Sequence, residues 1–250
     1  VTMSTVGQRE RATQNRVVRL FRETLKYDYL GDWEERPDNS HIEEAYVRAF
    51  LERQGYSTTL INRALYELNK AAGDQSKSLY DVNKAVYGLL RYGVQVKPDV
   101  GENTETVWLI DWRHPLNNHF AIAEEVTVTG EHTKRPDVVL YVNGIALGVL
   151  ELKRSVVSVS EGIRQNLDNQ KKTFIQPFFA SVQLVMAGND TEGLRYAVIE
   201  TKEKYYLTWK EENDDGAIDN PLDRHLTQLC AKERLLEIVH DFIVFDAGVK

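Results

Sequence analysis

The stretch RPDVVLYVNGIALGVLELKR, residues 135–154, decides the fold because it holds two long apolar runs on either side of Asn143-Gly144. An Asn-Gly pair between two such runs is a strong short-range signal for a β-hairpin. Both runs are apolar at odd and at even positions, which is typical of strands that are covered on both faces. The stretch therefore predicts two neighbouring strands inside a sheet.

Three charged side chains interrupt these apolar strands: Asp137, Glu151 and Lys153. A charge in a buried strand costs several kcal/mol unless it is paired or bound to a metal ion. Two carboxylates on adjacent strands suit a divalent cation such as Mg²⁺, which prefers oxygen ligands and also binds substrate phosphate. A nearby lysine can neutralise charge that develops during the reaction. The three residues predict a site that hydrolyses a phosphodiester, and a structural ion-pair network is the competing interpretation.

The register of the hairpin decides whether these side chains can meet. A two-residue loop at Asn143-Gly144 would turn Asp137 and Glu151 to opposite faces, because a shift of one residue inverts every side chain. A three-residue loop that begins at Val142 would bring both acids and the lysine to one face. We expect the second arrangement, with a positive φ at Gly144, or a bulge elsewhere that makes the same correction. A regular two-residue hairpin would argue against the site.

The rest of the chain alternates between helical and strand-like patterns. Apolar residues recur at helical spacing over residues 10–25, 40–53, 57–72, 77–91, 160–174 and 223–245. Short β-branched and aromatic runs predict strands over residues 104–112, 119–129, 182–187, 194–199 and 204–209, in addition to the hairpin. Ser40, with Glu43 three residues later, forms the sequence signature of a capping box at the start of the second helix. The order predicts an α/β fold with a central mixed sheet flanked by helices.

This pattern predicts three parts of the chain. Residues 1–40 are expected to form a helical N-terminal extension, residues 41–210 the core, and residues 211–250 an acidic loop and a C-terminal helix. Val1 is not an initiator methionine, and the last residues leave an apolar stretch without a terminating signal. We therefore expect a piece of a longer protein.

The composition excludes several classes of protein. The chain has one cysteine, Cys230, so it has no internal disulfide framework and no multi-cysteine zinc site. No apolar run approaches the roughly 20 residues of a membrane span, and the N-terminus has no apolar core for a secretory signal. The net charge of −7 argues against a freestanding high-affinity nucleic-acid binder, but not against a nuclease that partners deliver to DNA. A cytoplasmic location fits these features.

Several motifs carry a resemblance to a known family. Pro136-Asp137 followed by Glu151-Leu152-Lys153 resembles the signature of the PD-(D/E)XK nuclease superfamily. The surrounding text, together with GIRQNLDNQ at 162–170 and AGNDTEGLRY at 187–196, closely resembles the N-terminal nuclease domain of the motor (R) subunit of type I restriction enzymes. The similarity extends from about Glu10 to the C-terminus. It implies a restriction-endonuclease-like PD-(D/E)XK core.

The resemblance also implies an activity and partners. These are Mg²⁺-dependent cleavage of double-stranded DNA, ATP-driven translocation by a motor domain that would follow Lys250, and separate specificity and methyltransferase subunits. The chain contains no GxxxxGK[ST] phosphate loop, so ATP is expected to bind only in the full-length protein. Without the motor, we expect the isolated chain to cut DNA weakly or undetectably.

The resemblance assigns roles to particular residues. Asp137 and Glu151 would be metal ligands, and Lys153 would be the catalytic lysine. Such sites often include an acid on the first core helix, for which Glu44 is the best match and Glu43 the second choice. Family members commonly carry a Q-x-x-x-Y motif on the helix after the E-x-K motif. Gln165 matches the glutamine, but Asn169 stands where the tyrosine would be, which leaves the role of this helix open.

Two other functions compete with this interpretation. One is a different PD-(D/E)XK enzyme, such as a DNA repair nuclease, which the sequence beyond Lys250 would separate from a restriction subunit. The other is a docking module with a degenerate nuclease fold, against which the intact set of Asp137, Glu151 and Lys153 argues.

Overall fold

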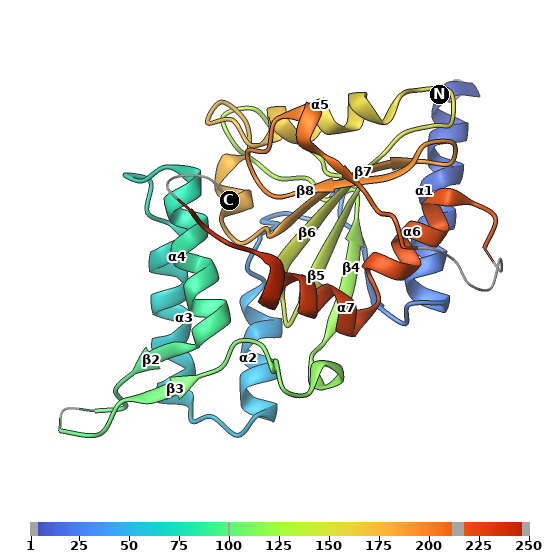
Figure 1. Ribbon diagram of the computed structural model, residues 1–250. Helices are drawn as coiled ribbons and strands as arrows, with labels where there is room; N and C mark the ends of the chain where they lie inside the picture. Colours follow the sequence, from blue (N-terminus) through green and yellow to red (C-terminus); the bar gives the residue numbers. More distant parts are fainter. Residues whose placement is uncertain (1–4, 100, 212–217, 247–250) are drawn as a thin grey trace.

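A mixed seven-stranded sheet forms the centre of the molecule (Figure 1). The computed structural model describes residues 5–99, 101–211 and 218–246. The strand order is β1-β4-β5-β6-β7-β8-β9; the pairs β1–β4 and β6–β7 are parallel and the other neighbours are antiparallel. The strands are β1 (Asp28–Asp32), β4 (Phe120–Glu124), β5 (Val138–Val142), β6 (Ile145–Leu152), β7 (Leu184–Asn189), β8 (Gly193–Ala197) and β9 (Leu207–Thr208). The predicted mixed sheet is confirmed.

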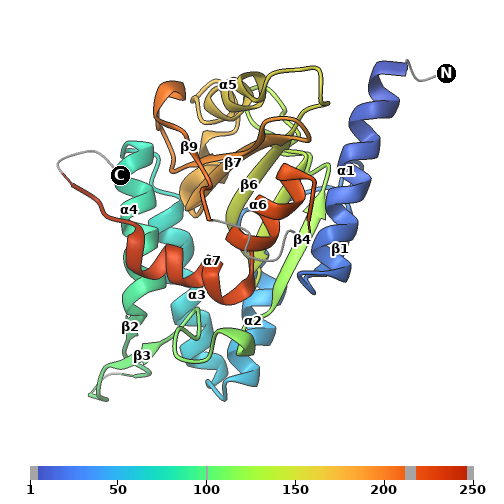
Figure 2. The same ribbon diagram turned by 45° about the vertical axis from the view of Figure 1, so that its right-hand side comes forward.

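Helices cover both faces of this sheet, as the apolar pattern of the hairpin requires. Every residue of β5 and β6 is buried. Val138 and Leu140 belong to a core shared with α1 (Thr5–Glu23), α6 (Pro221–Leu229) and α7 (Lys232–Glu237), whereas Val139 and Tyr141 belong to a core shared with α5 (Val159–Asn169). Figure 2 shows α6 and α7 in front of the sheet and α5 at its upper edge. The flanking helices are confirmed.

α5 makes the crossover between the parallel strands β6 and β7. Parallel neighbours need such a long connection, and a helix is its usual form. Gly162 lets the helix approach closely, because a Cβ at this position would lie 3.1 Å from the Cβ of Ala187 and 3.5 Å from that of Glu151. The first half of α5 is therefore held directly against the ends of β6 and β7.

Three further helices and a small ribbon extend from the turn end of the hairpin (Figure 1). They are α2 (Glu44–Arg53), α3 (Thr58–Ala72), α4 (Leu79–Tyr92) and the antiparallel ribbon of β2 (Val94–Val96) and β3 (Glu105–Val107). Ser57 caps α3 by accepting a hydrogen bond from the backbone N–H of Leu60, and α3 ends at Ala72, as the sequence predicts, with Gly73 as its C-cap.

Several boundaries differ from the prediction. The second helix begins at Glu44 with Glu43 as its N-cap, so Ser40 is not the cap, although the Glu43 carboxylate accepts a hydrogen bond from the Ser40 backbone N–H. Residues 28–32 form β1 in the sheet, so residues 1–40 are not simply a helical extension. Short 3-10 turns at Pro115–Asn117, Gln176–Ala180 and Glu203–Tyr205 were not predicted.

The C-terminal part is also divided differently. The single helix expected over 223–245 is broken at Cys230 and Ala231 into α6 and α7, and α7 continues as a π-helical turn at Ile238–Phe242. Most of the acidic loop expected at 211–215 lies outside the described residues. Along the parts of the chain that the structure describes, no helix is both long and apolar enough to cross a membrane.

Candidate active site

The turn of the hairpin has two residues, not three. Val142 pairs directly with Ile145, and the loop residues Asn143 and Gly144 have φ values of 50° and 81°. Positive φ at both positions is the mark of a type I′ turn, which matches the twist of the flanking strands. The prediction of a positive φ at Gly144 is confirmed, and the three-residue loop beginning at Val142 is wrong.

A bulge inside the hairpin makes the correction that the longer loop was expected to make. Tyr141 pairs with Ala146 but Leu140 pairs with Gly148, so Leu147 is an additional residue on β6. Beyond this bulge, Val138 pairs with Leu150. Continuing the register by one residue places Asp137 opposite Glu151, on the face that α5 covers. The structure therefore brings the two acids to one face by the second of the two routes that the sequence allowed.

The acid pair lies at the open end of the two strands. The backbone N–H of Leu152 donates a hydrogen bond to Asp137 Oδ2 at 2.6 Å, which fixes the position of that carboxylate. The Glu151 side chain is completely buried, and its Oε1 accepts a hydrogen bond from the Asn169 amide at 3.3 Å. Its second oxygen, Oε2, is buried with no hydrogen-bond partner among the described residues. A buried acceptor in this state is rare and costly.

The charges around Glu151 reinforce this cost. Burial raises the pKa of the Glu151 carboxyl well above its usual range, the nearby Asp137 charge raises it further, and the Lys153 ammonium lowers it. Desolvation and a like charge both disfavour the ionised form, so an added cation would relieve both effects. The electrostatics thus favour a positive partner for this carboxylate.

Lys153 follows directly after β6. Its backbone N–H donates to the Gly188 carbonyl at 2.9 Å, which extends the pairing of β6 with β7. Its Cγ lies 3.5 Å from the position that a Cβ of Gly162 would take, so the stem of the side chain runs beneath α5. The lysine and Glu151 therefore flank the same point on the helix.

The C-terminal half of α5 contributes two polar residues to this face. Asn169 contacts Glu151 directly. Gln165 is half-buried, three residues after Gly162 and four before Asn169, a spacing that puts these residues on one side of the helix. The structure thus places Asn169, which departs from the family pattern, in contact with a proposed metal ligand.

The two glutamates of the second helix are not part of this group. The Glu43 backbone N–H donates to the Gly144 carbonyl, and α2 therefore packs at the turn of the hairpin. This lies at the opposite end of β5 from Asp137, about 17 Å away at the usual rise per strand residue. The Glu44 carboxylate accepts a hydrogen bond from the Asn69 amide at 2.6 Å, and Glu43 forms an ion pair with Arg36. The structure does not bring Glu44 or Glu43 to the acid pair.

A third acid near the pair was missed from the sequence. The backbone N–H of Glu125 donates to the Asp137 carbonyl, so Glu125 lies at the adjoining end of β4, and its charge also raises the pKa of Glu151. Arg11 and Arg135 hold its carboxylate through ion pairs of 3.0 and 2.7 Å. In the sequence, the two consecutive glutamates Glu124 and Glu125 at the end of the apolar run of β4 were the only sign of this acid. Its significance depended on the strand order, which the sequence does not reveal.

The donor set fits a hydrated divalent cation. Within the described residues, no group of three or more His, Cys, Asp and Glu side chains is placed to hold a metal ion. Mg²⁺ does not require such a cage, because it commonly binds through one or two carboxylates, several waters and substrate phosphate. The unpartnered Glu151 Oε2 and the facing Asp137 carboxylate supply two oxygen donors of the required kind.

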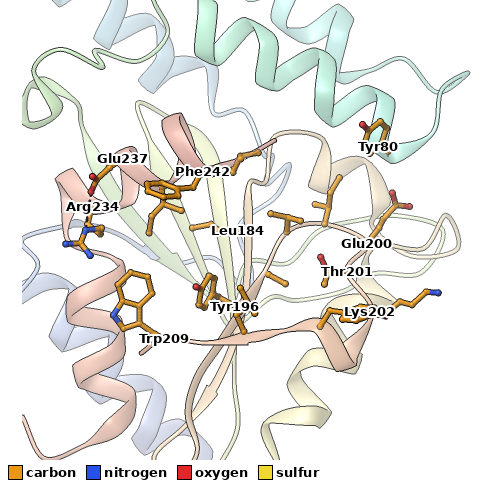
Figure 3. Close-up of a pocket in the computed structure, with 17 residues that line it drawn as sticks. Tyr80, Leu184, Tyr196, Glu200, Thr201, Lys202, Trp209, Arg234, Glu237 and Phe242 are labelled. Atoms are coloured by element: carbon orange, nitrogen blue, oxygen red, sulfur yellow. Dashed lines mark ion pairs between the residues drawn. The ribbon is translucent and has the colours of Figure 1, made fainter. Parts of the chain in front are cut away.

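A large apolar cavity lies elsewhere in the molecule. It has a volume of about 1020 Å³ and is formed by β8, the segment after it, and the C-terminal helical part (Figure 3). Tyr196 and Trp209 face Phe242 across it, and its lining includes neither Asp137 nor Glu151 among the described residues. Because phosphodiester hydrolysis depends on charged groups, the acid pair and not this cavity is the candidate active site.

The fold and the site together define an α/β protein whose central strands end in a buried glutamate, a partly buried aspartate and a lysine. Residues 7–204 match the family described as "Type I restriction enzyme R protein N terminus". The match covers well over half of the chain, so the chain belongs to this family. The family resemblance seen in the sequence is confirmed.

Individual relatives agree with this assignment. The chain is 26% identical over 150 residues to the "Type I restriction enzyme EcoprrI endonuclease subunit" of Escherichia coli, covering 58% of the chain and 47% of that protein. It is 25% identical over 175 residues to the HindI endonuclease subunit of Haemophilus influenzae, covering 66% and 16%. It is 24% identical over 222 residues to the putative MjaVIIIP endonuclease subunit of Methanocaldococcus jannaschii, covering 78% and 20%. The chain therefore spans less than half the length of these relatives.

Proposed function

We propose that this chain is the Mg²⁺-dependent endonuclease domain of a type I restriction enzyme R subunit, with a PD-(D/E)XK core that hydrolyses DNA phosphodiesters. One observation carries the proposal. A bulge at Leu147 brings Asp137 and Glu151 to the same buried face, and it leaves Glu151 Oε2 with no hydrogen-bond partner in the described part of the chain. Membership of the R-protein N-terminal family supports it.

Each residue of the site has a separate role in this proposal. Asp137 and Glu151 would hold the cation, with Asp137 oriented by the Leu152 backbone N–H. When bound, Mg²⁺ supplies Lewis-acid stabilisation of the phosphate charge. Lys153 would place its ammonium group near the negative charge that develops on the phosphate in the transition state. Gln165 would face the substrate side of α5.

The rest of the machinery is proposed to lie outside this chain. The relatives from Haemophilus influenzae and Methanocaldococcus jannaschii are about five to six times longer than their matched part, which leaves room for an ATP-driven motor. Sequence recognition and methylation would belong to separate specificity and methyltransferase subunits. The net charge of −7 gives the domain little electrostatic affinity for DNA, so these partners would deliver double-stranded DNA to it. The isolated chain is expected to cut weakly.

A cleavage assay with the longer R subunit and its partner subunits tests the proposal. Asp137→Ala and Lys153→Ala should abolish cleavage of double-stranded DNA in the presence of Mg²⁺ and ATP. Both variants should keep ATP hydrolysis, because the motor is separate. Glu44→Ala is the matched control, because it removes a carboxylate at the other end of the hairpin, and it should cut like the wild type. Unchanged cleavage by both site variants would reject the assignment and favour a docking role.

The same assay separates a restriction subunit from a repair nuclease of the same superfamily. A restriction subunit should cut only with ATP and with DNA that carries the recognition sequence of its partner subunits. Efficient cutting without ATP or partners would favour the repair nuclease.

A further inference from the structure

The buried face of α5 carries two asparagines that differ in what they contact. Asn166 and Asn169 are both completely buried and lie one helical turn apart. The Asn166 amide donates to the Met186 backbone carbonyl at 2.8 Å, whereas the Asn169 amide donates to Glu151 Oε1 at 3.3 Å. In both asparagines the amide nitrogen is used, and the amide oxygen Oδ1 is buried with no hydrogen-bond partner in the described chain. Asn166 thus serves the packing of α5 on β7, and Asn169 serves a charged side chain of the proposed site.

The contact between Asn169 and Glu151 leaves two oxygens open. Glu151 Oε2 and Asn169 Oδ1 are both buried, and neither has a hydrogen-bond partner in the described ranges. When Glu151 is ionised, both oxygens can only accept a hydrogen bond, so neither satisfies the other. Carboxylate and amide oxygens are the donors that Mg²⁺, Mn²⁺ and Ca²⁺ prefer. An ionised Glu151 beside the Asp137 carboxylate leaves a buried carboxylate oxygen that a cation would satisfy.

We propose that Asn169 is a positioning residue for the cation site, an inference that rests on the proposed function. Its amide nitrogen holds Oε1 of Glu151, so that the second carboxylate oxygen is kept available to the cation. Because Glu151 is completely buried, this hydrogen bond limits the rotation of its carboxylate. Residues in this relation to a metal ligand typically change metal affinity by 10- to 100-fold when they are replaced. The asparagine that departs from the family's Q-x-x-x-Y motif thereby acquires a specific role.

The packing of α5 does not depend on this contact. Gly162 gives the close approach to β6 and β7, Val159 and Ile163 belong to the core on this face, and Asn166 is bonded to β7. Replacing Asn169 should therefore leave the helix docked. This separation allows the positioning role to be tested apart from stability.

Binding of Mn²⁺ to the 250-residue chain, followed by electron paramagnetic resonance, tests the inference directly. Asn169→Ala should raise the dissociation constant about tenfold or more and alter the spectrum of the bound ion. Asn166→Ala is the matched control, because it removes an equally buried amide on the same face, and its dissociation constant should stay within about twofold of the wild type. Asn169→Leu and Asn166→Leu repeat the comparison with side chains that fill the space and exclude water.

The set of variants separates a failure of the role of Asn169 from a failure of the proposed nuclease function. Wild-type affinity in both Asn169 variants, or an equal loss in the Asn169 and Asn166 variants, would overturn the role of Asn169. Asp137→Ala reports on the site itself and should lose most of the Mn²⁺ binding. If Asp137→Ala binds like the wild type, the proposed function fails together with the inference. If only the Asn169 variants bind normally, the inference alone fails.

Discussion

The two ends of the β5–β6 hairpin differ in how completely their buried polar side chains are hydrogen-bonded. At the turn, the Asn143 amide donates to the Leu109 carbonyl and to Asn118 Oδ1, and its own Oδ1 accepts from the His119 N–H. At the open end, Glu151 accepts one long hydrogen bond, and its other oxygen has no partner within the described chain. Both residues are completely buried.

The difference separates a structural use of polarity from a functional one. A satisfied buried amide rigidifies the backbone around it and specifies one conformation. An unsatisfied buried carboxylate costs stability and persists only where the surrounding structure holds it or where a ligand compensates. We infer that the turn end defines the register and that the open end uses the register to present the acids.

The largest expected effect is on the turn. Gly144 has φ +81°, and a Cβ there would lie 2.7 Å from the Glu43 carbonyl oxygen. Gly144→Ala should therefore lower the free energy of unfolding by about 3 kcal/mol, through backbone strain and the clash with α2. Urea unfolding followed by circular dichroism measures this change.

Gly88→Ala in α4 is the control for that variant, because a Cβ there meets nothing within 4 Å among the described residues. It should raise the unfolding free energy by about 0.5–1 kcal/mol, since alanine is the better helix former. A Gly144→Ala protein as stable as the wild type would show that the turn does not define the register.

At the open end of the hairpin, loss of the Glu151 charge should lower the cleavage activity but raise the stability of the chain. Glu151→Gln keeps the shape but removes a buried carboxylate that faces Asp137. Cleavage by the longer R subunit should fall more than about a hundredfold, because a metal ligand is lost. In the absence of divalent cations, the unfolding free energy of the chain should rise by about 1–2 kcal/mol. A less stable Glu151→Gln protein would mean that the carboxylate is a structural partner after all.

The turn end should also lose stability in acid. Burial lowers the pKa of His41 to about 4, and its carbonyl accepts a hydrogen bond from the Ala146 N–H just beyond the turn. The His41 imidazole binds a proton near pH 6.5 in the unfolded chain and only near pH 4 in the folded chain. Stability from this group is therefore present above pH 6.5 and is lost as the pH falls toward 4. The expected loss is about 2 kcal/mol between pH 7 and pH 5.

His41→Asn should flatten this part of the stability profile, because the amide does not titrate. Urea unfolding of both proteins at several pH values gives the comparison. Parallel profiles for wild type and variant would assign the acid sensitivity to other groups.

The local sequence pattern was sufficient to predict most elements of the core. The hairpin around Asn143-Gly144, its two apolar strands and the helix that follows were predicted, because the period of apolar residues is a local property of helices and strands. The three charged residues could be singled out for the same reason, since Asp137, Glu151 and Lys153 interrupt an otherwise apolar hairpin.

Other features depended on contacts between distant segments. β1 lacks an apolar pattern of its own, and it is a strand because it pairs with β4, more than 80 residues later. Glu44 sits on a helix that ends at the expected residue, Arg53, but α2 packs at the turn because Glu43 bonds to Gly144. The sequence shows no signal for either contact, because neither changes the local spacing of apolar residues.

The sequence by itself determined that two buried strands would carry two acids and a lysine, and it placed the chain in its family. Only the tertiary structure decided that the acids meet. The turn has the two residues that its Asn-Gly pair favours, and the bulge at Leu147 restores the shared face. A bulge depends on the pairing and packing of the whole sheet and not on the local sequence pattern. The tertiary structure likewise brought Asn169 to Glu151, because Gly162 lets α5 pack closely on Ala187 and Glu151.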